Sequence, residues 1–242
     1  MIELKEITKK YGDFRAVDNL NLTVARGEIF GFLGPNGAGK TTTIKMIAGV
    51  LEPSSGTITV GGIDILKQPE AAKRKIGFIP DRPYLYEKLT GMEFLKFTAD
   101  LYGVPNEIFR ENARKNLAMF SLADWSDELI ESYSHGMKQR LIMSAALLHE
   151  PEIIIVDEPM VGLDPAAISM VKELFQNLAR HGVSIFMSTH TLAVAEEVCD
   201  RVGIIHRGRL VASGTTADLR REANVTDADL EMIFLNLTNI AN

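Results

Sequence analysis

The sequence predicts an α/β fold with a mainly parallel sheet core, antiparallel strands at the N-terminus and an inserted helical subdomain. Three observations carry this prediction. The opening third of the chain has strand patterns, helical periodicity alone dominates from about residue 89 to 149, and strand and helix patterns alternate from residue 152 onward. We therefore expect a domain over residues 1–220, interrupted by the helical subdomain at 89–149, and a C-terminal helical tail over 221–242.

Each expected element rests on a local pattern. Residues 2–8 and 20–25 alternate apolar and polar, as half-buried strands do, whereas 29–33 (IFGFL) is continuously apolar, as in a buried parallel strand. A helix is expected from about Lys40 to Leu51 after a glycine-rich turn. The remaining expected strands are 57–60, 76–79, 152–156, 184–188 and 203–206, and the remaining expected helices outside the subdomain are 165–180 and 191–198.

The composition is that of an ordinary globular protein. Of 242 residues, 46% are hydrophobic and 24% are charged, and the formal net charge is -6. An acidic chain gains nothing from the phosphate backbone of nucleic acid, so we expect no nucleic-acid partner, and the short basic run 73–75 is interpreted as a solvated face. The single cysteine, Cys199, cannot form an internal disulfide and is interpreted as a buried thiol.

Neither a signal peptide nor a membrane helix is expected. The N-terminus carries charge from its third residue, and the longest apolar runs, such as 153–156, are far below the ~20 residues that a membrane helix needs. Any membrane role is therefore expected to require a partner.

A glycine-rich segment, GPNGAGKT at residues 34–41, matches the pattern G-x-x-x-x-G-K-[ST] between a buried strand and a helix. Its glycines let successive backbone N–H groups point at phosphate oxygens, and the helix adds the positive end of its dipole. We expect the Lys40 ammonium to reach the β- and γ-phosphates and the Thr41 hydroxyl to bind Mg²⁺. The alternative, a glycine turn that matches by chance, is disfavoured by the flanking strand and helix. The expected nucleotide contacts here are Gly34, Pro35, Asn36, Gly37, Ala38, Gly39, Lys40, Thr41 and Thr42.

Two carboxylates follow the apolar run at 153–156, at the strand end where an open α/β sheet carries its ligand chemistry. Asp157 is placed to hold Mg²⁺ through water, and Glu158 is the better candidate to polarise an attacking water. The alternative is a capping or solvated acidic pair. The phosphate loop upstream favours the catalytic interpretation.

Further motifs resemble those of ABC ATPases. The segment YSHGMKQR at 133–140 is similar to the family's signature, commonly LSGGQ, and it precedes the acidic strand as in the family. Residues 161–164 (VGLD) resemble the D-loop, 188–190 (STH) resemble the switch histidine, and Tyr11 resembles the aromatic residue that stacks on adenine. The motifs occur in the family order over roughly residues 2–220, which implies the ABC ATPase version of the P-loop NTPase fold.

The resemblance implies an ATP-hydrolysing subunit of an ABC transporter, with ATP and Mg²⁺ as cofactors, held at the cytoplasmic face of a membrane by a transmembrane permease subunit. It implies a head-to-tail homodimer or heterodimer in which each ATP lies between the phosphate loop of one subunit and the signature of the other. Catalysis would rest on Lys40, Glu158 and His190, although His190 could instead be a core histidine. The residues implied to act in trans are Ser134, His135, Gly136 and Met137 of the signature and Asp164 of the D-loop.

The sequence departs from the family pattern at three positions. Asp81 stands where glutamine is usual; its carboxylate can bind Mg²⁺ or hold water, but it has a shorter reach and no amide donor. His135 replaces a glycine and Met137 a glutamine, while Ser134 and Gly136 remain. His135 is either an exposed loop residue or a direct nucleotide contact.

The stretch IGFIPDRPYLYEKLTG and the tail LEMIFLNLT are most similar to the bacterial export branch, whose permease is a separate chain. In ABC transporters a groove beside this stretch receives a short permease helix, and we expect Tyr84, Leu85 and Tyr86 to help form it. The alternative is that these side chains fold inward and cap the helical subdomain. Two rival functions stay open: an ABC ATPase that acts on DNA or ribosomes, and an adaptor that binds ATP without turnover.

Overall fold

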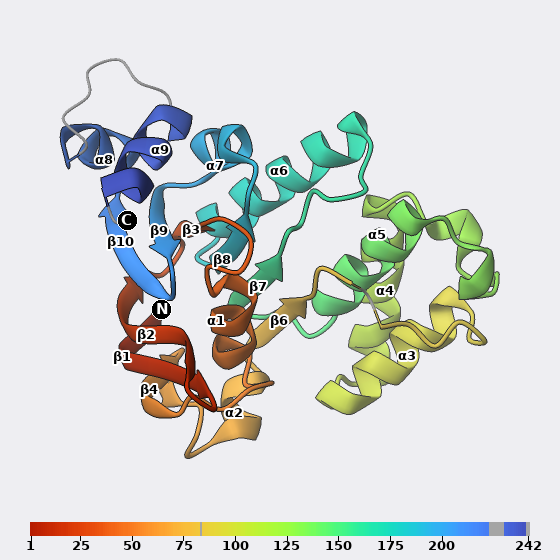
Figure 1. Cartoon of the computed structure of the whole chain (residues 1–242). Coiled ribbons are helices and arrows are strands. Elements are labelled where there is room, and N and C mark those ends of the chain that lie inside the picture. Colours follow the sequence, from red (N-terminus) through yellow and green to blue (C-terminus); the bar gives the residue numbers. More distant parts are fainter. Residues whose placement is uncertain (83, 223–229, 241–242) are drawn as a thin grey trace.

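The computed structural model describes residues 1–82, 84–222 and 230–240, the last three of these by their backbone alone (Figure 1). The sequence interpretations of residue 83 and of the tail at 223–229 and 241–242 lie outside the described residues. In the described part of the chain, no helix combines the length and the apolar character that crossing a membrane requires.

The N-terminal sheet is antiparallel. Its strand order is β2-β1-β4-β5, and every neighbouring pair runs antiparallel. Its strands are β1 (Ile2–Tyr11), β2 (Phe14–Val24), β4 (Ser55–Val60) and β5 (Ile63–Asp64). The alternation of buried and exposed side chains along β2 explains the predicted strand at 20–25, since Leu20, Leu22 and Val24 are buried.

The central sheet has the order β10-β9-β3-β8-β7-β6, with parallel pairing from β9 to β6 and β10 antiparallel at the edge. Every residue of β3, β7 and β8 is buried, which explains the apolar runs IFGFL in β3, IIIV in β7 and the shorter IFM in β8. The sheet contains β3 (Ile29–Leu33), β6 (Ile76–Ile79), β7 (Ile153–Asp157), β8 (Ser184–Thr189), β9 (Arg201–His206) and β10 (Arg209–Gly214). The α/β class with a mainly parallel core and N-terminal antiparallel strands is therefore confirmed.

Helices cover the central sheet (Figure 1). The first, α1, ends at Ile47, short of the Leu51 predicted, because the chain turns through Gly49, whose φ is +66°. At the C-terminal side, the buried face of α9 packs with α7 and the β9–β10 hairpin through Leu230, Ile233 and Leu237. These helices are α1 (Lys40–Ile47), α2 (Pro69–Lys73), α6 (Pro165–Arg180), α7 (Leu192–Val198), α8 (Thr216–Glu222) and α9 (Leu230–Ile240).

The helical subdomain lies at one side of the molecule, away from the antiparallel sheet (Figure 1). It consists of α3 (Gly91–Tyr102), α4 (Asn106–Met119) and α5 (His135–Ala146), with short 3₁₀ turns at Ala123–Trp125 and Ile130–Ser132. Thr90 and Glu93 form a capping box at the start of α3. Phe94, Leu117 and Leu141 belong to one buried cluster with side chains of β7, so the subdomain shares a core with the sheet.

His149 joins the subdomain to the sheet. Its ring stacks on Tyr102 at the end of α3, with centroids 3.7 Å apart, and its Nε2–H donates to the Ile76 carbonyl of β6 at 3.0 Å. Burial lowers the pKa of His149, partly offset by the Ile76 carbonyl, which raises it. The neutral imidazole is therefore the form that fits this junction.

Candidate functional site

The phosphate loop connects β3 to α1, in the strand–loop–helix context that its pattern requires. Two positions of the loop require glycine because they lie very close to neighbouring backbone. A Cβ at Gly34 would lie 2.4 Å from the carbonyl oxygen of Ile205, and one at Gly39 would lie 2.5 Å from that of Ala16. Gly39 also has a φ of +110°, which L side chains rarely adopt. The loop shape therefore depends on these glycines through packing as well as through backbone freedom.

Lys40 is held in the centre of the loop. Its Nζ donates to the carbonyl of Gly34 at 2.6 Å and to that of Pro35 at 3.3 Å, and only 7% of the residue is exposed. Burial lowers the pKa of Lys40, while the carboxylates of Glu158 and Asp157 act in the opposite direction. The ammonium thus lies where a phosphate could replace its carbonyl partners.

The acidic pair stands at the end of β7, next to β8 in the parallel sheet. Asp157 is only 4% exposed and accepts a hydrogen bond from the Ser188 hydroxyl. Glu158 has a φ of +52°, a conformation that costs a non-glycine residue about 1–3 kcal/mol and persists only where surrounding contacts impose it. Its backbone N–H donates to the Ser188 carbonyl at 3.2 Å.

His190 pairs with Glu158. The Nδ1 atom of His190 lies 2.9 Å from Oε1 of Glu158, and the backbone N–H of His190 donates to Oε2 at 3.4 Å. Both residues follow the ends of neighbouring parallel strands, which is why residues 32 positions apart meet. The candidate base and the candidate switch histidine therefore form one hydrogen-bonded unit.

A cleft of about 540 Å³ brings most of the predicted nucleotide residues together. Gly34 and Ala38 are instead buried and do not line the cleft. Phe14, Ala16 and Val161 also line the cleft; the sequence interpretation missed Phe14 and Ala16 and placed Val161 only in the D-loop. The predicted residues in the lining are Tyr11, Pro35, Asn36, Gly37, Gly39, Lys40, Thr41, Thr42, Asp81, Asp157, Glu158 and His190.

Phe14 could have been found from its turn. Tyr11 and Phe14 are register partners at the tip of the β1–β2 hairpin, where Gly12 takes a φ of +58°. Tyr11 is 51% exposed and Phe14 64%, so two aromatic rings stand at the mouth of the cleft. Such rings can stack on a base.

The signature residues begin α5. Ser134 caps this helix and accepts a hydrogen bond from the Met137 N–H at 3.3 Å. The imidazole of His135 lies against Gly162 in the loop before α6, and the Asp164 side chain caps α6 by accepting from the Ala167 N–H. Among the described residues, those lining the nucleotide cleft include none of the signature residues.

Oxygen donors suitable for Mg²⁺ face the cleft. Thr41, Asp81 and Asp157 all line it, and Mg²⁺ commonly takes one or two carboxylates together with substrate phosphates. Among the described residues, no cluster of three or more His, Cys, Asp and Glu side chains could hold a metal ion. The donors present fit an ion that arrives with the nucleotide.

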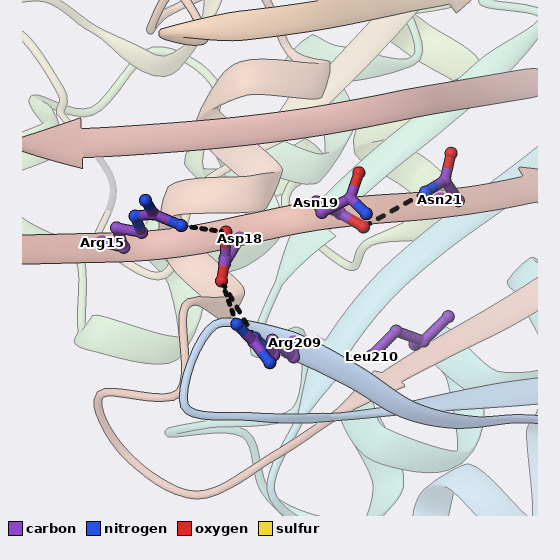
Figure 2. Close-up of a pocket in the computed structure, with 6 residues that line it drawn as sticks. All are labelled: Arg15, Asp18, Asn19, Asn21, Arg209 and Leu210. Carbon is purple, nitrogen blue, oxygen red and sulfur yellow. Dashed lines mark hydrogen bonds and ion pairs between the residues drawn. The ribbon is translucent and has the colours of Figure 1, made fainter.

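A second hollow lies between β2 and β10, and Figure 2 shows its lining. Asp18 accepts hydrogen bonds from Arg15 and from Arg209, and the Arg209 contact lowers the pKa of Asp18 (Figure 2). The Asp18–Arg209 ion pair ties the antiparallel sheet to the edge of the central sheet, whereas the Arg15–Asp18 pair lies within β2. The phosphate loop and the acidic pair lie in the other cleft, which is the candidate site.

A phosphate loop facing the acidic end of a parallel strand defines a nucleotide-binding protein of the P-loop class. A family model described as ABC transporter matches residues 17–161, and the chain belongs to that family of ATPases, as an ATP-binding subunit. The ABC-type transporter ATP-binding protein EcsA of Bacillus subtilis (strain 168) is 37% identical over 98% of this chain and 96% of its own length. The probable multidrug ABC transporter ATP-binding protein YbhF of Escherichia coli (strain K12) is 38% identical over 98% of this chain. The chain spans only 41% of the length of YbhF.

Solved structures agree with this assignment. The structure of an ATP-binding subunit of an ABC transporter has a TM-score of 0.94 at 37% identity, over 98% of this chain and 99% of that one. The cassette MJ0796, dimeric in a post-hydrolysis state with ADP and Pi, has a TM-score of 0.78 at 26% identity, over 89% of this chain and 98% of that one. The resemblance and the fold expected from the sequence are thereby confirmed.

Proposed function

We propose that this chain binds and hydrolyses ATP as one half of a dimer and thereby energises a separate membrane permease. One observation carries the proposal: the chain holds its phosphate loop and its signature turn at different places, so that its own signature residues do not line its own nucleotide cleft. Two copies arranged head to tail would bring the two halves together. The dimeric, post-hydrolysis state of the similar cassette MJ0796 supports this arrangement.

Within one subunit, the proposed roles follow from the geometry. Tyr11 and Phe14 would stack on the base, and the loop amides with Lys40 would hold the phosphates. Glu158 would orient the attacking water, and His190 would hold the Glu158 carboxylate through the 2.9 Å contact. Thr41, Asp157 and Asp81 would hold Mg²⁺, which would offset charge on the phosphate oxygens when bound.

Across the dimer, Ser134 and the amides that begin α5 would offer donors to the γ-phosphate from the far side. ATP would then hold the subunits together, and loss of the bridging γ-phosphate would release them. His135, Gly136, Met137 and Asp164 would lie beside this contact.

The membrane partner and direction of transport are the finer part of the proposal. YbhF is named a probable multidrug transporter protein, which supports an export role, and the exposed residues Tyr84 and Tyr86 offer a partner surface. An affinity-tagged chain expressed in its native membrane context should recover a polytopic membrane protein. Recovery of nucleic acid or ribosomes in its place would favour the rival function, and an absence of phosphate release by the recovered complex would favour an adaptor.

The shared site has a direct test. A Lys40→Ala chain and a Ser134→Arg chain should each be inactive, because one loses a phosphate cation and the other places bulk where the γ-phosphate contacts its partner. Mixing the two gives a heterodimer with one intact and one doubly defective composite site, so each heterodimer should hydrolyse ATP at about half of the rate of a parent dimer. If the mixture shows only the sum of two inactive proteins at a concentration where the dimer forms, the sharing is wrong.

A further inference from the structure

The His135 ring lies directly against the backbone of Gly162. A Cβ built on Gly162 would lie 2.4 Å from Cδ2 and 2.7 Å from Nε2 of His135, so the ring occupies the space that any side chain at 162 would need. Gly162 has a φ of +78°, which also favours glycine. The first turn of α5 therefore touches the loop between Glu158 and α6 through this side chain.

That loop has weak internal support. Its turns are closed by the Val161 N–H to the Glu158 carbonyl at 3.3 Å and by the Leu163 N–H to the Met160 carbonyl at 3.4 Å, both beyond the usual range of strong backbone hydrogen bonds. Firmer contacts lie at its two ends, where Glu158 meets Ser188 and Asp164 caps α6. Between these ends, Met160 is buried in the core cluster, and the His135 ring lies against Gly162.

The loop directly follows Glu158, the candidate base, which must be held in position to orient the attacking water. Glu158 has the left-handed backbone described above, which neighbouring contacts must impose, and Val161 lines the nucleotide cleft. A shift of Gly162 would move Val161 directly and would loosen the Val161–Glu158 turn. The His135 ring is thus connected to the candidate base Glu158 through Gly162 and Val161.

We propose that His135 is a positioning residue for hydrolysis: it braces the loop at 159–164 and thereby holds Glu158 and Val161 in their working geometry. The inference rests on the proposed function, since it assigns His135 to the support of the hydrolytic site in its own chain. The ring faces Gly162, which places it beside the loop as a structural brace. In a dimer, the partner's nucleotide would contact Ser134. The contact between His135 and Gly162 would then transmit a displacement of the first turn of α5 to Glu158 of the same chain.

The test is a set of substitutions with a rescue. His135→Gly should lower kcat about tenfold with an unchanged KM for ATP, a split expected when an interaction serves the transition state alone. His135→Phe retains a ring of similar position and should keep most of the rate. Gly162→Ala should lose activity because its Cβ collides with the ring, and His135→Gly should partly restore it in the double variant, whereas His135→Phe should not.

Gly62 supplies the matched control for backbone strain. Its φ is +81°, close to that of Gly162, but a Cβ there would meet nothing within 4 Å. Gly62→Ala should therefore show the cost of alanine in this conformation without a collision, and it should keep near-parent hydrolysis. Equal loss in the Gly62 and Gly162 variants, or no rescue of Gly162→Ala by His135→Gly, would overturn the proposal.

A readout independent of turnover separates this inference from the proposed function. Amide hydrogen exchange at Val161 and Leu163 should accelerate about tenfold in His135→Gly and stay near the parent rate in His135→Phe, because loss of a local brace favours local opening. Unchanged exchange in His135→Gly would refute the brace. Absence of phosphate release from the parent chain and its complex would refute the proposed function, while the exchange comparison would still decide the role of His135.

Discussion

The substitution Glu158→Gln tests the centre of the proposed chemistry. Glutamine has nearly the shape of glutamate, so the cleft wall and the left-handed backbone at 158 should persist. The amide retains one oxygen acceptor and replaces the other with a donor. Of the two present contacts, His190 Nδ1 to Oε1 at 2.9 Å and His190 N–H to Oε2 at 3.4 Å, the amide can satisfy both if Nδ1 accepts. The variant should therefore fold and bind nucleotide.

The loss should appear in the chemical step. Removing a general base typically slows a reaction by about 10²- to 10⁴-fold, or roughly 2.7–5.4 kcal/mol in barrier. The affinity for ATP, in contrast, should not fall. Burial lowers the pKa of Lys40, and the Glu158 carboxylate opposes this shift because it attracts the ammonium; the same negative charge repels phosphate. Without this charge, ATP should bind as tightly as to the parent or somewhat more tightly.

Phosphate release, calorimetry with ATP and size-exclusion chromatography with ATP separate these effects. The expected result is slow release, retained affinity and a dimer that persists with ATP. Glu150→Gln is a matched control, since Glu150 is an exposed glutamate outside the cleft lining that also has a positive φ, +50°. Near-parent phosphate release by Glu158→Gln would refute the assignment of the base, and equal losses in both variants would attribute the effect to the backbone.

The remaining predictions concern binding, docking and pH. Lys40→Ala should weaken ATP binding about 10- to 100-fold by calorimetry, the weight of charged hydrogen bonds, whereas Lys45→Ala on the exposed face of the same helix should not; equal affinities would contradict the role of Lys40. Tyr84 and Tyr86 are 91% and 60% exposed, so replacing both with alanine should shift Tm by less than about 2 °C and keep basal hydrolysis, yet weaken membrane recruitment; unfolding or unchanged recruitment would be contrary results. The pKa of His149 is below its usual 6.5 in the folded state, so as the pH falls the unfolded chain takes up the proton first. At pH values below about 6.5, the free energy of unfolding should therefore decrease by at most about 1.4 kcal/mol per pH unit. Urea unfolding of His149→Phe at pH 7.5, 6.5 and 5.5 should show a shallower decline, and parallel declines would argue against His149.

The parts of the fold that could be predicted are those whose signal is local. The apolar runs of β3, β7 and β8 are buried on both faces, so their patterns are visible in the sequence alone. The prediction missed β10, because an antiparallel edge strand reading RLVASG has mixed burial and contains small residues. It also missed α2, a helix of five residues that begins at Pro69, since a single turn carries no periodicity.

The same distinction applies to the candidate site. The phosphate loop and the acidic pair are contiguous motifs, and the structure places both at one cleft. The contact between His135 and Gly162 joins residues from separate elements, so no spacing rule could indicate it. The three residues predicted to form a permease groove differ in their placement. Tyr84 and Tyr86 are exposed, whereas Leu85 packs against the subdomain core. Docking of a permease there stays a prediction.

The charged groups Lys40 and Glu158 each have hydrogen-bond partners within the site. Lys40 is bound by the carbonyls of Gly34 and Pro35, and the Glu158 carboxylate is paired with His190. A triphosphate must therefore displace the loop carbonyls from Lys40, and an attacking water must share the acceptor that now serves His190. Part of the binding free energy is consequently used to rearrange the cleft, and only a ligand with phosphates in place favours the rearranged state. ADP should therefore compete well for the loop but leave the Glu158–His190 pair undisturbed, whereas ATP should alter the environment of His190. A histidine NMR titration of the Glu158→Gln and parent chains with each nucleotide would detect this difference, and identical His190 shifts with ADP and ATP would contradict a site that distinguishes the γ-phosphate.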